Sequence, residues 1–165
     1  MSSESGQPEG VAHLSDVFAG WDAYQRLLVE ALAPLTPDQL ALRAAPSLRS
    51  VGEIAGHIVA TRVWWFQNWM GEGDDSLVPM LTWDDADNPP TLNAAELELG
   101  LERTWHMIAS GLSRWTTADL GAEFERESKR HTRQWVIWHV IEHDLHHGGE
   151  IGITLGQHGL RAPDL

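Results

Sequence analysis

Apolar residues recur every three or four positions along most of this chain, a spacing that predicts amphipathic helices. The first such run extends from Leu14 to Leu35, and Pro34 is a natural stop for it. Three later runs lie at 54–69, at 97–115 and from about 132 to 155. We therefore expect four long helices.

Three helix starts carry a capping box, in which a small polar residue is followed three positions later by Glu or Gln. The pairs are Thr36 with Gln39, Ser50 with Glu53, and Asn93 with Glu96. The first pair predicts a short helical turn, and the other two predict the starts of the second and third long helices. Gly71 is a natural stop for the second helix.

Between Gly71 and Leu92 lies a long connection that contains six acidic residues, three prolines and Trp83. Its length exceeds that of ordinary helix–helix loops. We expect an ordered crossover or lid here rather than a plain turn.

A weak internal sequence repeat indicates how the helices are arranged. The string LTPDQL at 35–40 follows the first predicted helix, WTTADL at 115–120 follows the third, and each leads toward a helix that contains histidine. Two facing hairpins of this kind are typical of a four-helix bundle, and the alternating runs that indicate strands are nearly absent. The sequence thus predicts an all-α fold, a four-helix bundle with a long crossover between helices two and three. We expect residues 12–165 to form this single domain behind a disordered tail at 1–11.

Composition narrows the possible partners. The net charge is −13 and only 11 residues are Lys or Arg, which disfavours nucleic acid because phosphate contacts need clustered positive charge. No run approaches the roughly 18 apolar residues of a membrane span, and the start MSSESGQPEG lacks the order of a secretory signal. We expect a cytoplasmic protein without a membrane partner. Because the chain has no cysteine, thiolate chemistry would require a small-molecule thiol.

Four of the nine histidines fall within residues 139–147, in the string HVIEHDLHHGGE. On the fourth predicted helix, one continuous stripe is formed by Val136, Val140, His143, His147 and Ile151. Two inward positions are therefore histidine, and imidazoles four residues apart can converge on one metal ion. The side chains of His139 and His146 flank the stripe and are expected to be secondary.

A third histidine, His57, interrupts the inward face of the second predicted helix. Imidazoles from two packed helices could meet at a divalent metal ion that keeps open positions. A lone histidine on an apolar face is more often a hydrogen-bonded core residue, yet two in one apolar stripe need partners for their ring nitrogens. The stronger zinc motif HExxH is absent, because Asp144 follows His143.

The strings HVIEHDLHHGGEI and SVGEIAGHIVATRVWW, within four predicted helices, resemble the DinB/YfiT superfamily from about residue 12 onward. The resemblance implies a four-helix bundle of the DinB/YfiT type and a metal ion, usually nickel or zinc, held by His57, His143 and His147. Members often have Arg-Gly-Gln after the last ligand, where this chain has Gly148, Gly149 and Glu150. Characterised relatives include transferases and an isomerase that use mycothiol or bacillithiol. The resemblance implies a similar class of enzyme.

The leading hypothesis is a transferase in which a thiolate, from bacillithiol or mycothiol held at the metal, attacks an electrophilic small molecule. Hydrolysis by metal-activated water is the near alternative. No catalytic residue is identified: Glu53 is explained by its capping role, and the acidic residues of the fourth helix are as well explained by solvent or by histidine partners. The basic cluster at 126–133 is a candidate for binding a substrate carboxylate, although a surface position before the fourth helix explains it better.

Two further classes of protein remain open. A di-iron carboxylate bundle requires Glu and His three residues apart, whereas Glu53–His57 and Glu142–His146 are four apart. A non-catalytic, stress-related module that binds metal and dimerises is the more serious alternative. Nine tryptophans are many for 165 residues, and some are expected to line a pocket or to cover the partner in a homodimer.

Overall fold

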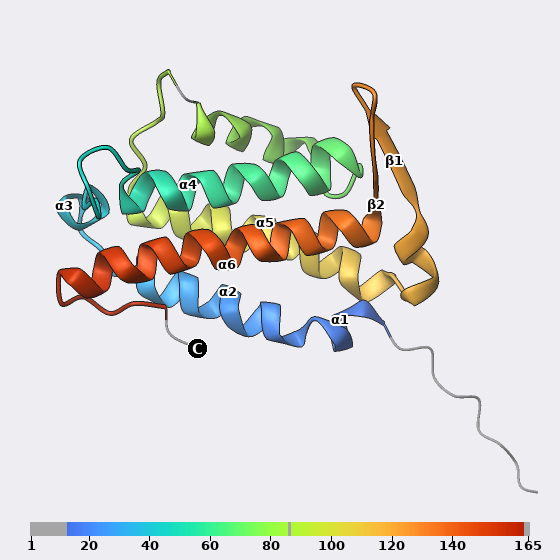
Figure 1. Ribbon diagram of the computed structural model, residues 1–165, viewed down its shortest axis with the longest axis horizontal. Helices are drawn as coiled ribbons and strands as arrows, with labels where there is room; N and C mark the ends of the chain where they lie inside the picture. Colours follow the sequence, from blue (N-terminus) through green and yellow to red (C-terminus); the bar gives the residue numbers. More distant parts are fainter. Residues whose placement is uncertain (1–12, 86, 164–165) are drawn as a thin grey trace, which may run out of the picture.

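The computed structural model describes residues 13–85 and 87–163, so the predicted tail at 1–11 lies outside the described residues. Helices dominate the described part (Figure 1), which confirms the all-α class. Its four longest helices are α2 (Ala19–Leu32), α4 (Val51–Arg62), α5 (Ala94–Arg114) and α6 (Arg133–Gln157). Helix α4 continues directly into a π-helix, η1 (Val63–Trp69).

Shorter elements connect these helices. They are α1 (Leu14–Val17), α3 (Pro37–Leu40), the 3₁₀-helices η2 (Asp75–Asp84) and η3 (Thr117–Gly121), and the strands β1 (Glu123–Arg126) and β2 (Lys129–Thr132). The first predicted helix is thus divided at Phe18 into α1 and α2, and it ends before Pro34 as expected.

All three predicted capping boxes are present. In each, the first side chain accepts a hydrogen bond from the third backbone N–H of the helix, and the Glu or Gln side chain accepts one in return. Gly71 has a φ of +72°, the left-handed conformation that ends a helix at low cost for glycine. These local rules explain why the helix starts were predictable.

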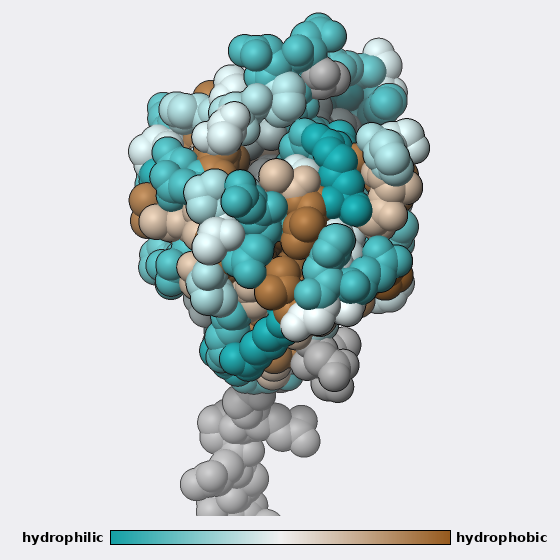
Figure 2. Space-filling view, turned by 90° about the vertical axis from the view of Figure 1, so that its left-hand side faces the viewer, coloured by the Kyte–Doolittle hydropathy of each residue, from teal (hydrophilic) through white to brown (hydrophobic). Residues whose placement is uncertain are grey.

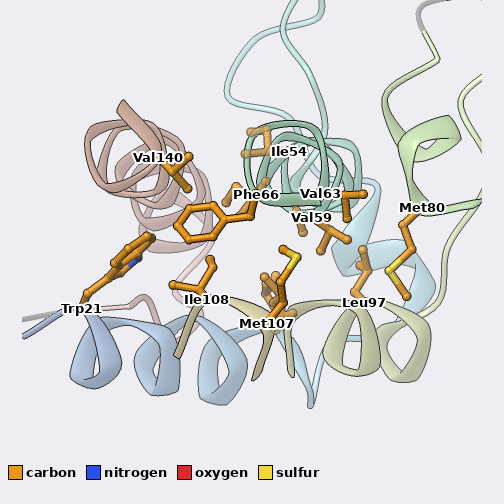
Figure 3. Close-up of a cluster of buried hydrophobic side chains, with 14 of the residues drawn as sticks. Trp21, Ile54, Val59, Val63, Phe66, Met80, Leu97, Met107, Ile108 and Val140 are labelled. Carbon is orange, nitrogen blue, oxygen red and sulfur yellow. The ribbon is translucent and has the colours of Figure 1, made fainter. Parts of the chain in front are cut away.

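Helix α4 lies at the centre of the packing, with α5, α6 and η2 against it, while α2 packs on α5. Figure 3 shows buried side chains from all these elements meeting in one core, among them Phe66 of η1, Ile108 of α5 and Val140 of α6. The one histidine of α4, His57, therefore has a neighbouring helix, α6, beside its ring.

Within the connection between Gly71 and Leu92, residues Asp75–Asp84 form η2, which contributes to this core. Leu77 and Met80 are buried (Figure 3 shows Met80), which attaches η2 to the α4–α5 surface. Glycines make room for Trp83: a Cβ on Gly100 would lie 2.4 Å from its ring, and one on Gly56 would lie 3.3 Å from its carbonyl oxygen. Glycines on α4 and α5 thus leave the space in which the end of η2 packs.

A feature that the sequence did not predict is the antiparallel hairpin of β1 and β2, in the register Glu123 to Thr132. Its two-residue turn, Glu127 and Ser128, has φ values of +50° and +66°. Such turns normally use Asn or Gly because other residues pay a steric cost at positive φ. Without those residues, the sequence carries no recognisable turn motif.

The core also contains a charged pair, Arg62 of α4 and Asp144 of α6, both completely buried. The Arg62 Nη2 and Nε donate to Asp144 Oδ2 at 2.7 and 3.0 Å, and Trp21 Nε1 donates to the same oxygen at 2.8 Å. The Nη1 of Arg62 donates to Gln25 Oε1 at 2.7 Å. This network joins α2, α4 and α6 and satisfies charges that would otherwise be costly to bury.

Figure 2 shows the end of the molecule that carries α3 and the C-terminal part of α6, largely covered by hydrophilic residues around a narrow apolar strip. Among the described helices, none combines the length and apolar character needed to cross a membrane.

Candidate metal centre

The structure brings together the three histidines that the sequence singled out. His57 comes from the second turn of α4, and His143 and His147 come from successive turns of α6. The Nε2 atoms of His57 and His143 lie 2.9 Å apart, and the ring centres of His57 and His147 lie 4.7 Å apart. One ligand atom from each ring lies within 4.8 Å of the other two.

This spacing fits a small divalent cation. Metal–nitrogen bonds of about 2.0–2.1 Å in a tetrahedral arrangement separate ligand nitrogens by about 3.3 Å. The rings of His57, His143 and His147 are each partly buried between the two helices. Three imidazoles at this separation need only small side-chain adjustments to share one ion.

Carboxylates contact the outer nitrogens of two of these rings. Glu150 Oε2 lies 2.6 Å from His147 Nδ1, one turn along the same helix. Asp84 Oδ2, at the end of η2, lies 2.8 Å from His57 Nδ1, although the angle of this contact falls outside that of a well-aligned hydrogen bond. A proton kept at Nδ1 leaves Nε2 free to bind a metal ion. Glu150, three residues after His147, therefore contacts a histidine of the site directly.

His143 is the most constrained of the three. Its Nε2 also lies 3.3 Å from Thr61 Oγ1, while its buried Nδ1 has no hydrogen-bond partner within the described residues. Burial, reinforced by His147 and His57, lowers the pKa of His143 to about 2. Burial also lowers the pKa of His57, against the opposing effect of Asp84. Both rings are thereby kept in the neutral form that binds metal ions.

The other two histidines of the 139–147 string occupy different positions. His139 Nδ1 lies 2.9 Å from Glu142 Oε1, and its ring stacks on Trp135. His146 is 69% exposed and lies 3.7 Å from Glu150 Oε1. His146, His147 and Glu150 are also close enough to hold an ion, but this second group is more open to solvent and shares His147 with the first.

Aromatic rings close the site on the side of the β-hairpin. His131, Trp135 and His139 lie four residues apart and stack successively, with ring centres 3.7 and 4.6 Å apart. The ring of Trp65, from η1, makes edge-to-face contacts with all three. Part of the unusual tryptophan content therefore forms a wall beside His143, whose ring centre is 6.5 Å from that of His139.

The opposite side of the site is open. A pocket of about 570 Å³ reaches His57, His147 and Glu150. Its remaining wall is formed by the segment before α4, the first turn of α4 and the C-terminal half of α6, namely Ala44, Ser47, Leu48, Arg49, Ile54, Ile153 and Thr154. The side chains of Leu48 and Ile153 are half or more exposed. Both line this pocket, which explains why apolar side chains are exposed here.

The remaining sequence candidates have structural partners elsewhere. Glu53 caps α4 and pairs with Arg43. Of the basic cluster, Arg126 donates to the carbonyl of Asn68, and Arg130 pairs with the acidic residues of β1. None of these contacts involves a metal-site histidine.

The residue that the sequence interpretation placed wrongly is Asp144. A solvent-facing charge, a partner of a site histidine or a catalytic residue was expected at this position, whereas the side chain is buried in the pair with Arg62. The spacing Val140, Asp144, Gly148 is as good a helical stripe as the one drawn through His143, and it is this stripe that is fully buried. The pattern could have indicated a buried acid, but not its partner on α4.

Comparison with known proteins gives a family. The family model described as the DinB superfamily matches residues 21–151. A solved structure of a DinB-like protein from Bacillus cereus has a TM-score of 0.70 and 23% sequence identity, over 93% of this chain and 97% of that one. At this identity the likeness concerns the fold. No curated protein matches the sequence.

Proposed function

The chain belongs to the DinB superfamily, and from this premise we propose that His57, His143 and His147 bind one divalent metal ion. The convergence of three imidazoles from two helices within 4.8 Å carries the proposal. Neutral imidazole suits zinc and nickel, the two metals that the family resemblance implies. We also interpret the four longest helices, with the long connection between the second and third, as a bundle of the DinB/YfiT type.

The residues of the chain prepare the site for such an ion. Burial keeps His143 and His57 neutral, and Glu150 holds the outer nitrogen of His147. The aromatic wall closes one side, so that a small molecule would approach through the pocket beside Ile54 and Ile153. A volume of about 570 Å³ lies within the range typical of small-molecule sites.

We propose that the protein is a transferase that joins a low-molecular-weight thiol, such as bacillithiol or mycothiol, to an electrophilic small molecule. When bound at three neutral ligands, a divalent ion lowers the pKa of a thiol or water at its open position. The chain supplies no thiol of its own, since it contains no cysteine. Its apolar pocket wall would exclude water from the reacting groups and thereby favour transfer over hydrolysis.

The test uses protein purified without an affinity tag and loaded with zinc or nickel. Bacillithiol, mycothiol or a simpler thiol is supplied with a haloarene, in which the new carbon–sulfur bond replaces the carbon–halogen bond and releases halide and a proton. Formation of the conjugate is followed by chromatography. Metal-dependent conjugation that is lost in His147→Ala would support the proposal. Hydrolysis at the same rate without thiol would make the protein a metal-dependent hydrolase. Metal binding without any turnover would favour the non-catalytic metal-binding module.

Homodimer formation and a cytoplasmic location remain predictions. Light scattering of the purified protein would give the oligomeric state directly. Immunoblotting of cell fractions would give its location.

A further inference from the structure

We propose that Asp84 is a positioning residue for His57, and that metal binding is coupled through this contact to the docking of η2 on α4. The inference rests on the proposed metal site. It adds a role for the acidic connection between the second and third long helices. In this role, η2 is part of the metal site although it contributes no ligand to the ion.

The two carboxylate oxygens of Asp84 contact different partners. Oδ2 lies 2.8 Å from His57 Nδ1, and Oδ1 lies 2.9 Å from Arg49 Nη2. Arg49 directly precedes Ser50, the residue that caps α4. The carboxylate is therefore held between the start of α4 and the ring that projects from its second turn.

This position makes Asp84 suitable for fixing the orientation of the His57 ring. A carboxylate beside Nδ1 favours the form that carries the proton there, which leaves the Nε2 lone pair for a metal ion. The His57 Nε2 is the nitrogen that lies 2.9 Å from His143 Nε2.

The backbone of η2 delivers Asp84 to this point. Its neighbour Trp83 lies against Gly100, where a Cβ would approach the ring to 2.4 Å, and against Gly56, which immediately precedes His57. Leu77 and Met80, in the first two thirds of the same element, are also buried. If the end of η2 moves away, its tryptophan and its carboxylate leave together.

Coupling of this kind is reciprocal. If docked η2 favours the metal-binding form of His57, then metal bound at His57 must favour docked η2 by the same factor. The metal affinity and the protection of the η2 amides against hydrogen exchange therefore both measure the same coupling free energy.

The first measurement compares Asp84→Asn with Asp85→Asn, a matched loss of one charge at the next residue, whose carboxylate accepts bonds from the backbone of its own turn. Zinc affinity is measured by competition with a chromophoric chelator. We expect Asp84→Asn to weaken binding by about ten- to a hundredfold, with Asp85→Asn close to wild type. Equal affinities of the two variants would overturn the proposal.

The second measurement is the position of the ring proton of His57, from long-range proton–nitrogen NMR spectra at pH 8 without added metal. We expect the Nδ1–H form in the wild type and a mixture in Asp84→Asn, because a neutral amide is a weaker acceptor than a carboxylate. An unchanged spectrum would show that Asp84 does not position the ring. This readout needs no bound ion, so it separates failure of this inference from failure of the proposed metal site.

The third measurement is hydrogen exchange of the 75–84 amides with and without zinc. Zinc should slow exchange in the wild type and should have a clearly smaller effect in Asp84→Asn. If zinc binds the wild type without slowing exchange in η2, the coupling is absent. If zinc does not bind the wild type at all, the proposed metal site fails, and the coupling fails with it.

Discussion

The Nε2 atoms of His57 and His143 lie 2.9 Å apart although they belong to different helices. Two ligands of one tetrahedral ion stand about 3.3 Å apart, so a bound metal would separate these atoms slightly. Measurements of metal content and of helical structure test the ligand function of these histidines separately from their contribution to folding.

Replacing His57, His143 or His147 singly by alanine should remove most of the metal while the protein stays helical. Apparent binding energies of about 10–16 kcal/mol for four-ligand zinc sites correspond to roughly 3 kcal/mol per ligand, or about a hundredfold in affinity. Elemental analysis and circular dichroism check the two parts of this prediction. His139→Gln and His146→Gln serve as controls and should retain the metal. Full metal content in His143→Ala would refute the assignment.

In the presence of a chelator, the protein should lose stability as the pH falls below about 6.5, the ordinary pKa of histidine. Burial lowers the pKa of His143 to about 2, so the folded protein keeps this ring neutral while the unfolded chain takes up a proton. The loss should approach about 1.4 kcal/mol per pH unit for this one group. Urea unfolding between pH 4 and 7 measures it, and His143→Gln should flatten the slope. An equal slope in the two proteins would assign the pH dependence to other groups.

Removing one member of the buried pair should be strongly destabilising. Asp144→Asn leaves the Arg62 guanidinium buried without its counter-charge, a change that typically costs about 3–5 kcal/mol. The double variant Arg62→Met, Asp144→Leu should recover much of this loss, since no unpaired charge remains. Urea denaturation gives the free energies. Arg161→Met, which breaks an exposed pair with Glu30, is the control and should change stability by at most about 1 kcal/mol.

The two glycines after His147 should respond oppositely to alanine. A Cβ on Gly148 would lie 1.8 Å from Tyr24 Oη, and overpacking of this kind costs about 1–3 kcal/mol. A Cβ on Gly149 would meet nothing within 4 Å, so Gly149→Ala should stabilise the helix by about 0.5–1 kcal/mol. Thermal unfolding of both variants distinguishes them. A stable Gly148→Ala protein would mean that Tyr24 can move aside without cost.

The sequence was sufficient for helix starts and helix faces, which depend on nearby residues with recognisable spacing, but not for the β1–β2 hairpin, whose turn at Glu127 and Ser128 carries no Asn or Gly. The capping boxes at Ser50 and Asn93 identify helix starts because the partners lie three positions apart. The spacing of His143 and His147 places both rings on one side of α6 for the same reason. Local periodicity thus fixed which residues can meet, although not the distance between the helices that carry them.

Features that depend on contacts between distant segments were missed. The pairing of Arg62 with Asp144 spans 82 residues, and although the helical spacing could have indicated that Asp144 is buried, nothing near it in the sequence indicates Arg62 as its partner. The approach of Asp84 to His57 depends on how Trp83 fits against Gly100. Neither relationship produces a periodic pattern in the sequence, because packing between helices determines both.

The buried pair has a geometrical consequence for the histidines. Successive residues of an α-helix project about 100° apart, so His143 points toward His57 while Asp144 points into the core. Arg62 and Trp21 grip Asp144 from two other helices, which sets the rotation of α6 about its own axis. A side chain tip about 5–6 Å from that axis travels about 1 Å for every 10° of rotation. The Arg62–Asp144 pair therefore fixes the rotational orientation of α6, and with it the direction in which His143 and His147 project. A substitution in the pair would shift both imidazoles although it contacts neither ring.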